Sequence, residues 1–112
     1  MEENCDLYKT LFLQNIRHDY DLARTLRLVI RYEKIKALEF ALKQIKNIND
    51  IWIKIDVSPK LNNPKYENIS VLDFALHREN KSIINLLKKY NAKTRCELLK
   101  ENPCKDLPLG RD

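Results

Sequence analysis

Apolar residues recur at helical spacing between Ser70 and Ala92, in two sets separated by the polar run 77–82. Residues three and four positions apart lie on one face of an α-helix, and so short a polar break joins antiparallel neighbours. The stretch therefore predicts a helix, a tight turn and a second helix. The apolar positions are Leu72, Ala75 and Leu76 in the first helix and Ile83, Ile84, Leu86 and Leu87 in the second.

Residues 21–49 repeat this pattern and predict an earlier helix pair. Asp21 is a suitable N-cap for its first helix. Leu26 aligns with Leu72, which gives an offset of 46 residues between the pairs. The other aligned positions are Val29 with Ala75, Ile30 with Leu76, Leu38 with Ile84, and Phe40 and Ala41 with Leu86 and Leu87. Both pairs are expected to share one structural template.

Residues 50–69, between the two helix pairs, show the period of a β-strand followed by a turn. The apolar residues Ile51, Ile53, Ile55 and Val57 alternate with Trp52, Lys54, Asp56 and Ser58. A period of two residues is typical of a strand with one buried face. Pro59, Asn62, Asn63 and Pro64 give a dense turn signal, and residues 65–69 are the expected return strand. The segment predicts a hairpin finger.

The two ends of the chain are expected to cover the ends of the helix pairs. Helical spacing predicts a capping helix over residues 6–20, with Asp6 as its N-cap. Residues 95–112 are expected to form a capping turn and a loose tail, because Pro103, Pro108 and Gly110 prevent a long helix. At 112 residues, the chain is expected to form a single domain.

The later helix pair resembles an ankyrin repeat. The family motif Thr-Pro-Leu-His-x-Ala falls on residues 70–75, and Ile-Val-x-x-Leu-Leu and Gly-Ala fall on the second helix and its end. The sequence departs from the signature at Val71, Asp73, Glu79 and Asn91. The resemblance implies a mostly α fold, an ankyrin-like stack of antiparallel helix pairs with one enlarged β-hairpin or loop finger. The alternative is a generic helical-hairpin protein.

The spacing and two of the departures make specific structural predictions. The family period is about 33 residues, so about 13 residues are inserted in the finger. Asn adopts left-handed backbone geometry readily, so Asn91 is expected to replace the glycine that ends a repeat. Ile45 holds the equivalent position in the first pair. A β-branched residue is strained in that geometry, so this helix is expected to end differently.

The resemblance also implies a binding surface. In ankyrin-like folds, partners dock on the concave side formed by the hairpin tips and the exposed face of the first helix of each pair. The positions transferred to this chain are Leu28, Arg31, Tyr32, Tyr66, Glu67, Ile69, Phe74, His77 and Arg78. The set is aromatic and basic, a composition enriched in interfaces. The alternative is that Leu28, Ile69 and Phe74 pack inward and the others are ordinary surface.

Trp52 is a further candidate for partner binding. It stands on the polar side of the alternating strand, where an exposed indole would be an anchor for a partner. The alternative is that it packs on the neighbouring helix or on Tyr66 across the hairpin. Both placements remain open from the sequence.

These residues favour a non-catalytic protein–protein interaction module, an adaptor or inhibitor that could act on host proteins as an effector. The second hypothesis is a small basic nucleic-acid-binding protein, because the net charge is +5. Its basic residues would be Arg24, Arg27, Arg31, Lys34, Lys88 and Lys89. The basic residues are dispersed, which is more typical of a solvated surface. The third hypothesis is a subunit that is stable only in an oligomer, because each repeat leaves an apolar face to be covered.

The three cysteines, Cys5, Cys96 and Cys104, form no CxxC pair, which favours reduced and unpaired thiols. Such thiols indicate a cytosolic protein, in its own cell or in a host cell. The first ten residues lack the features of a signal peptide, and no segment reaches the roughly 18 apolar residues of a membrane span.

The sequence offers no catalytic constellation. Neither His18 nor His77 has a carboxylate or thiol at a catalytic or metal-binding spacing, and structural roles are expected for both. Gly110 is the only glycine, which excludes a glycine-rich phosphate loop. We expect no enzyme activity, no cofactor and no metal.

Overall fold

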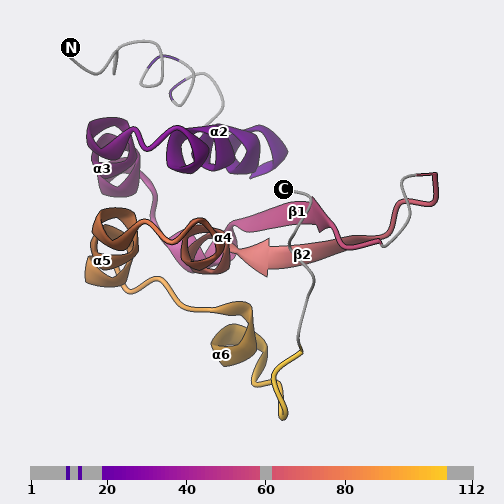
Figure 1. Ribbon diagram of the computed structural model, residues 1–112. Helices are drawn as coiled ribbons and strands as arrows, with labels where there is room; N and C mark the ends of the chain where they lie inside the picture. Colours follow the sequence, from indigo (N-terminus) through magenta and orange to yellow (C-terminus); the bar gives the residue numbers. More distant parts are fainter. Residues whose placement is uncertain (1–9, 11–12, 14–18, 59–61, 106–112) are drawn as a thin grey trace.

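The computed structural model describes residues 10, 13, 19–58 and 62–105, and this part is mostly helical with one two-stranded antiparallel sheet (Figure 1). Its elements are α2 (Asp19–Arg31), α3 (Ile35–Gln44), the 3₁₀ turn η1 (Ile48–Asp50), β1 (Trp52–Asp56), β2 (Tyr66–Ser70), α4 (Val71–Arg78), α5 (Lys81–Lys89) and α6 (Arg95–Leu99). The expected capping helix over residues 6–20 and the end of the tail fall largely outside the described residues.

The helices of the two pairs form layers beside the hairpin. α3 and α5 pack on each other on one side, while α2 and α4 pack on each other between that side and the strands (Figure 1). β1 packs on both α2 and α4, and β2 packs on α4. The hairpin therefore lies against the first helix of each pair, on the side away from α3 and α5.

Both helix pairs turn through the same local backbone geometry. Glu33 and Glu79 have left-handed φ angles of 56° and 58°, and they lie 46 residues apart, the offset expected from the sequence. Each of the two donates its backbone N–H to a carbonyl three residues earlier, at 3.1 Å. Left-handed geometry is uncommon for a glutamate, so its recurrence supports a shared template for the two turns.

The second helices of the pairs end in different ways, as expected. Asn91 has a φ of 64°, the left-handed geometry predicted for it. Ile45 is extended, with φ −80° and ψ 129°, so α3 stops without a left-handed residue. The predicted N-cap at Asp21 is wrong, because α2 begins at Asp19 and Asp21 lies inside the helix. Apolar spacing identifies the buried face of a helix, but it fixes the first residue of the helix only to within about one or two positions.

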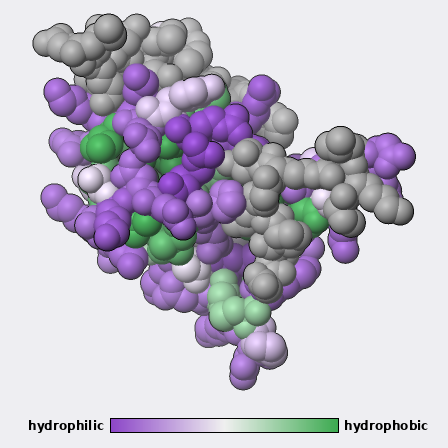
Figure 2. All heavy atoms as spheres, in the orientation of Figure 1, coloured by the Kyte–Doolittle hydropathy of each residue, from purple (hydrophilic) through white to green (hydrophobic). Residues whose placement is uncertain are grey.

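One apolar cluster joins the described helices α2 to α5 with both strands. The most deeply buried large side chains are Leu26, Ile30, Leu38, Ile53, Ile69, Phe74, Ile83 and Leu87. Burial of each such side chain contributes about 1.5–3 kcal/mol. On the face drawn in Figure 2, the described surface is mostly hydrophilic, with small and separated hydrophobic patches.

The hairpin follows the alternation of its sequence. Ile51, Ile53, Ile55 and Val57 are all buried, as the period predicts. Ser58 is buried as well, against the alternation, and its N–H donates to the Asp56 carboxylate at 2.8 Å. The return strand runs from Tyr66 to Ser70, one residue later than expected.

Two capping boxes fix the starts of α4 and α6. The Ser70 hydroxyl accepts from the Asp73 N–H at 3.1 Å, and the Asp73 carboxylate accepts from the Ser70 N–H. Thr94 and Glu97 form the same reciprocal pair at the start of α6. These bonds satisfy N–H groups that lack partners within the helix. Because Ser70 also ends β2, the first box sets the sharp corner between the sheet and α4.

Cys96 and Cys104 form a disulfide with a Cα–Cα distance of 5.3 Å. The expectation of unpaired thiols is therefore wrong for these two cysteines. They are separated by eight positions, and the chain after α6 turns back far enough to bring them together. The prediction of a cytosolic protein was based on unpaired thiols, and the disulfide removes that basis, because disulfides persist in oxidising compartments. No helix among the described residues is long and apolar enough to cross a membrane.

We expect thiol titration of the denatured, unreduced protein to find one free thiol, because two of the three cysteines are paired. Full reduction should expose three thiols and lower the free energy of unfolding by at most about 3 kcal/mol, since the closed loop is short. Three reactive thiols before reduction would contradict the disulfide.

Glu79→Gly is expected to raise the free energy of unfolding by up to about 1 kcal/mol. Glycine removes the Cβ penalty of left-handed geometry, about 1–2 kcal/mol, but adds freedom to the unfolded chain. Thermal unfolding measures the difference. Glu39→Gly, on the exposed face of α3, is the matched control and should lower stability by about 0.5–1 kcal/mol. Equal destabilisation by both changes would contradict the assignment of strain to the turn.

Candidate functional site

The described surface has a hollow of about 690 Å³ between α2 and the exposed face of the hairpin. We call it the α2–hairpin groove. Its lining residues are Ala23, Arg24 and Arg27 from α2, Asp50 from η1, and Trp52, Ile53, Lys54, Tyr66 and Asn68 from the strands. Three separate stretches of chain thus meet in one depression.

The pairing of the strands places the polar and aromatic side chains of the hairpin on one face. Lys54 lies opposite Asn68, and Asp56 lies opposite Tyr66. Cross-strand partners share a face of the sheet, and positions two apart along a strand return to that face. Trp52, Lys54, Asn68 and Tyr66 therefore face the groove, whereas the isoleucines of β1 face the core.

Arg27 fixes the wall of the groove that α2 provides. Its Nη1 donates to the backbone carbonyl of Lys54 at 3.1 Å, and its guanidinium carbon lies 5.7 Å from the centroid of the Phe74 ring. A guanidinium at this distance over an aromatic ring is attracted by the electron density of the ring face. The one side chain thereby ties α2 to β1 and to α4.

Lys54 and Tyr66 form the opposite wall. The Lys54 Nζ lies 4.8 Å from the centroid of the Tyr66 ring, a cation–π distance. Tyr66 is 54% exposed, so the contact holds a largely solvent-accessible ring over the groove. One face of the ring is covered by the ammonium group.

Two of the expected partner-binding residues, Trp52 and Tyr66, therefore meet in this groove. Trp52 is half-buried and lies opposite Ser70, four positions along β2 from Tyr66, so the two aromatic residues do not face each other across the ladder. The sequence missed the association of these aromatic residues with Arg24 and Arg27, which it assigned to the nucleic-acid hypothesis. The strand period placed Trp52 and Lys54 on one polar face, but the packing of β1 on α2 brings them to the arginines, and no local sequence pattern shows that packing.

Three other expected binding residues lie in the last turn of α2 and directly after it. Leu28 and Tyr32 are 40% and 58% exposed, and Arg31 is partly exposed. Leu28 lies four positions after Arg24, one turn along the same helical face. The alternative that Leu28 packs inward is wrong. These residues extend the surface of the groove toward the end of α2.

Ile69 and Phe74 do not belong to a binding surface. Ile69 is 2% exposed and faces Ile53 in the ladder, and Phe74 is completely buried. Both strands pack on α4, and Arg27 covers the Phe74 ring. The transferred template exposes these positions, but the enlarged hairpin covers them here. The alternative that both pack inward is confirmed.

The remaining expected residues lie apart from the groove. His77 is exposed and lines a second hollow of about 550 Å³, together with Asp73 and Arg95. Arg78 is exposed at the end of α4. Glu67 is engaged by basic side chains from the C-terminal part of the chain. The structure thus divides the predicted set among several places.

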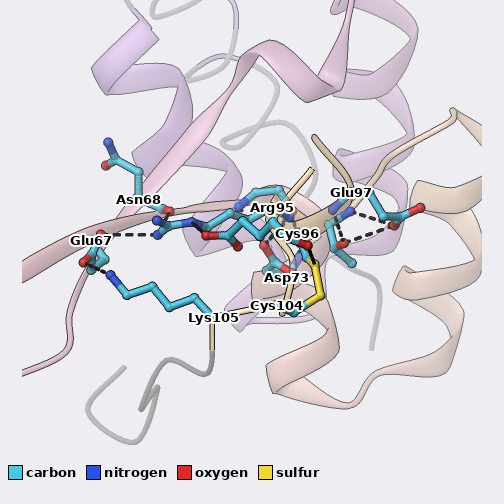
Figure 3. Close-up of polar contacts among 11 residues, drawn as sticks. Glu67, Asn68, Asp73, Arg95, Cys96, Glu97, Cys104 and Lys105 are labelled. Atoms are coloured by element: carbon cyan, nitrogen blue, oxygen red, sulfur yellow. Dashed lines mark hydrogen bonds and ion pairs between the residues drawn. A yellow bond between two sulfur atoms is a disulfide. The ribbon is translucent and has the colours of Figure 1, made fainter. Parts of the chain in front are cut away.

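Arg95 is the centre of a charged cluster beside β2, which sequence inspection missed (Figure 3). Its Nη1 donates to Glu67 Oε2 at 3.3 Å, and its Nε lies 3.6 Å from Glu101 Oε2. Lys105 Nζ lies 2.7 Å from the other Glu67 oxygen. We call Glu67, Asp73, Arg95, Glu101 and Lys105 the Arg95 cluster. The disulfide closes the loop that carries Glu101 and ends next to Lys105.

Asp73 links this cluster to the start of α4. Its Oδ2 accepts from the Ser70 N–H at 3.1 Å, the Ser70 hydroxyl at 3.0 Å and the Arg95 backbone N–H at 2.8 Å. A carboxylate at a helix N-terminus is also favoured by the helix dipole. The single oxygen therefore joins β2, α4 and α6.

Arginines from both sides hold the two outer edges of the hairpin. Arg95 Nη1 donates to the carbonyl of Asn68 at 2.9 Å, as Arg27 Nη1 does to the carbonyl of Lys54. Lys54 and Asn68 face each other, and both carbonyls point outward, as in a non-hydrogen-bonded antiparallel pair. Each outer edge of the hairpin therefore has an arginine donor at mid-strand.

Among the described residues, no group of three or more His, Cys, Asp or Glu side chains could hold a metal ion. No protein-family model, curated protein or solved structure matches this chain. The functional argument therefore rests on the side chains themselves.

We expect Glu67→Gln to weaken the dependence of stability on acidic pH. Hydrogen bonds from Lys105 and then Arg95 hold the pKa of Glu67 below its ordinary value of 4.5. A carboxylate with a lowered folded-state pKa stabilises the fold above about pH 4.5, and that contribution is lost as the pH falls through the folded-state pKa. Urea unfolding between neutral pH and about pH 3 measures the difference.

Glu39→Gln is the matched control for this substitution. The Glu39 carboxylate pairs with Lys43 at 3.5 Å on the exposed surface of α3, and an exposed pair of this kind contributes little. We expect the control to keep the pH profile of the wild type. If both variants lose stability with acid as steeply as the wild type, the ion pairs of Glu67 do not support the fold.

Proposed function

We propose that this chain is a non-catalytic protein-binding module, an adaptor or inhibitor whose binding surface is the α2–hairpin groove. The observation that carries the proposal is the gathering of Arg24, Trp52, Lys54 and Tyr66 from separate elements into one hollow. Arginine and large aromatic residues are enriched among those that dominate binding energy at interfaces. The exposed Leu28 and Tyr32 enlarge the available apolar area.

We infer that the scaffold of this surface is an ankyrin-like stack of two helix pairs. The recurrence of the left-handed glutamate turn at an interval of 46 residues supports the inference, as does the layer order of α3 and α5, α2 and α4, and the hairpin. In such a stack, the groove would lie on the concave side. The hairpin would be the enlarged finger between the two repeats.

The arrangement of charge favours a protein partner over nucleic acid. Arg24 and Arg27 line the groove, whereas Lys88 and Lys89 lie at the end of α5, in the layer on the far side from the hairpin. A duplex or single strand binds through a continuous track of basic residues. The basic residues of the nucleic-acid hypothesis are split between two sides of the molecule.

The groove also lacks the elements of a catalytic centre. Its ionisable lining residues are Arg24, Arg27, Lys54, Tyr66 and Asp50. Nucleophilic catalysis requires a serine, cysteine or similar group within hydrogen-bond reach of a base. The lining residues in the described part of the chain include no serine, cysteine or histidine, so the proposal assigns binding alone to this surface.

Replacing Arg24 by Glu and Trp52 by Ala together should lower the retention of partner proteins from a nuclease-treated lysate by about tenfold or more. The substitutions remove one aromatic contact and reverse one charge within the groove. Quantitative mass spectrometry of proteins captured by the full chain measures retention. Circular dichroism checks that each variant is folded.

Lys36→Glu is the matched control, because Lys36 is an exposed cation on α3, in the layer away from the hairpin. It makes the same charge change and should leave the captured proteins unchanged. Equal capture by all three proteins would refute the groove as the binding surface. Capture from an untreated lysate that is absent from the nuclease-treated lysate would favour nucleic acid. Light scattering that finds only a stable oligomer would favour the subunit hypothesis.

A further inference from the structure

We propose that the occupant of the α2–hairpin groove is an extended, acidic peptide segment of another protein. This inference rests on the proposed function and names the chemistry of its partner. It depends on four properties of the groove, namely its charge, its capped strand edges, the partial cover of its aromatic rings and its length.

The charge of the groove is complementary to an acidic segment. Among the described residues that line it, Arg24, Arg27 and Lys54 are cationic, and the carboxylate is that of Asp50. Lys54 is exposed, so its charge acts on an approaching partner before contact. Complementary potentials raise association rates and exclude partners of the same sign. A basic or neutral segment would gain less from this surface.

The strand edges determine how a segment could lie. Peptides often bind by adding a strand to an open sheet edge. Here the outward carbonyls of Lys54 and Asn68 already accept from Arg27 and Arg95. The two arginine side chains stand where an added strand would donate to these carbonyls, so the proposed segment crosses the exposed face of the hairpin and contacts its side chains. The exposed amide of Asn68 can both donate to and accept from a peptide backbone.

The aromatic residues favour a peptide over single-stranded nucleic acid. Proteins bind such strands by stacking bases on open aromatic faces. The Lys54 ammonium covers one face of the Tyr66 ring at 4.8 Å, and Trp52 is half-buried in the groove wall. Both rings are thus partly covered, and partly covered aromatic surface suits contact with an apolar side chain. An acidic segment with one apolar residue would match both the charge of the groove and its aromatic rings.

The length of the surface sets the length of the segment. α2 has 13 residues and is therefore about 20 Å long. Extended chain rises about 3.3 Å per residue, so about six residues cover that distance. The stripe of Leu28, Arg31 and Tyr32 beyond the groove lies within that reach. A short linear segment of a larger partner is therefore long enough to fill the groove.

Selection of random twelve-residue peptides on the immobilised full chain tests the proposal. We expect the enriched peptides to carry an excess of Asp and Glu around an apolar residue. A synthetic copy of an enriched peptide is then titrated against the full chain in solution. Trp52 is the only tryptophan, so its fluorescence reports occupancy of the groove directly. Arg24→Glu should raise Kd about tenfold, and the Lys36→Glu control should change it less than twofold.

Each result supports or overturns the inference. Enrichment of neutral or basic peptides whose binding is lost in the Trp52→Ala variant would overturn the acidic chemistry and leave the proposed function intact. Acidic peptides that bind the wild type and Arg24→Glu equally would overturn the role of the groove. If no peptide is enriched, the partner is not a linear segment, and the capture experiment alone decides the proposed function. A twelve-nucleotide DNA strand that shifts Trp52 fluorescence at lower concentration than any peptide would overturn both.

Discussion

The position of the hairpin depends on two arginines that cap its outer edges. A two-stranded sheet is marginally stable by itself and exposes unpaired backbone groups along both strands. In this chain, Arg27 reaches the carbonyl of Lys54 from α2, and Arg95 reaches the carbonyl of Asn68 from α6. The isoleucines of β1 anchor the other face in the core. The groove exists because these contacts hold the hairpin at a fixed position beside α2.

Arg95 makes the C-terminal part of the chain a structural support for the groove. Its guanidinium contacts Glu67 and the carbonyl of Asn68, and its backbone N–H binds Asp73 at the start of α4. The disulfide and the Lys105–Glu67 pair hold the following loop against the same strand. Tyr66 and Asn68, on either side of Glu67, line the groove. We therefore expect a change near α6 to act on the groove through β2.

The sequence predicts the helices and strands well because each period reports which face of one element is buried. It identifies both helix pairs, the alternation of β1 and the different ends at Ile45 and Asn91. The sequence does not predict burial that depends on contacts between elements. Phe74 is an example, because the family template exposes this position whereas the hairpin covers it here. The contacts of Arg27 with Lys54, and of Arg95 with Asn68, join residues 27 positions apart in sequence. No local pattern encodes such pairs.

The residues between the helix pairs serve two purposes because a strand has two faces. A helix pair by itself leaves an apolar face that a neighbouring element has to cover. Ile53 and Ile55 supply part of that cover from one face of β1, while Trp52 and Lys54 present the other face to solvent and to α2. A one-residue slip of the strand would reverse both faces together. The core packing that fixes the register therefore also fixes which side chains of the hairpin face the groove.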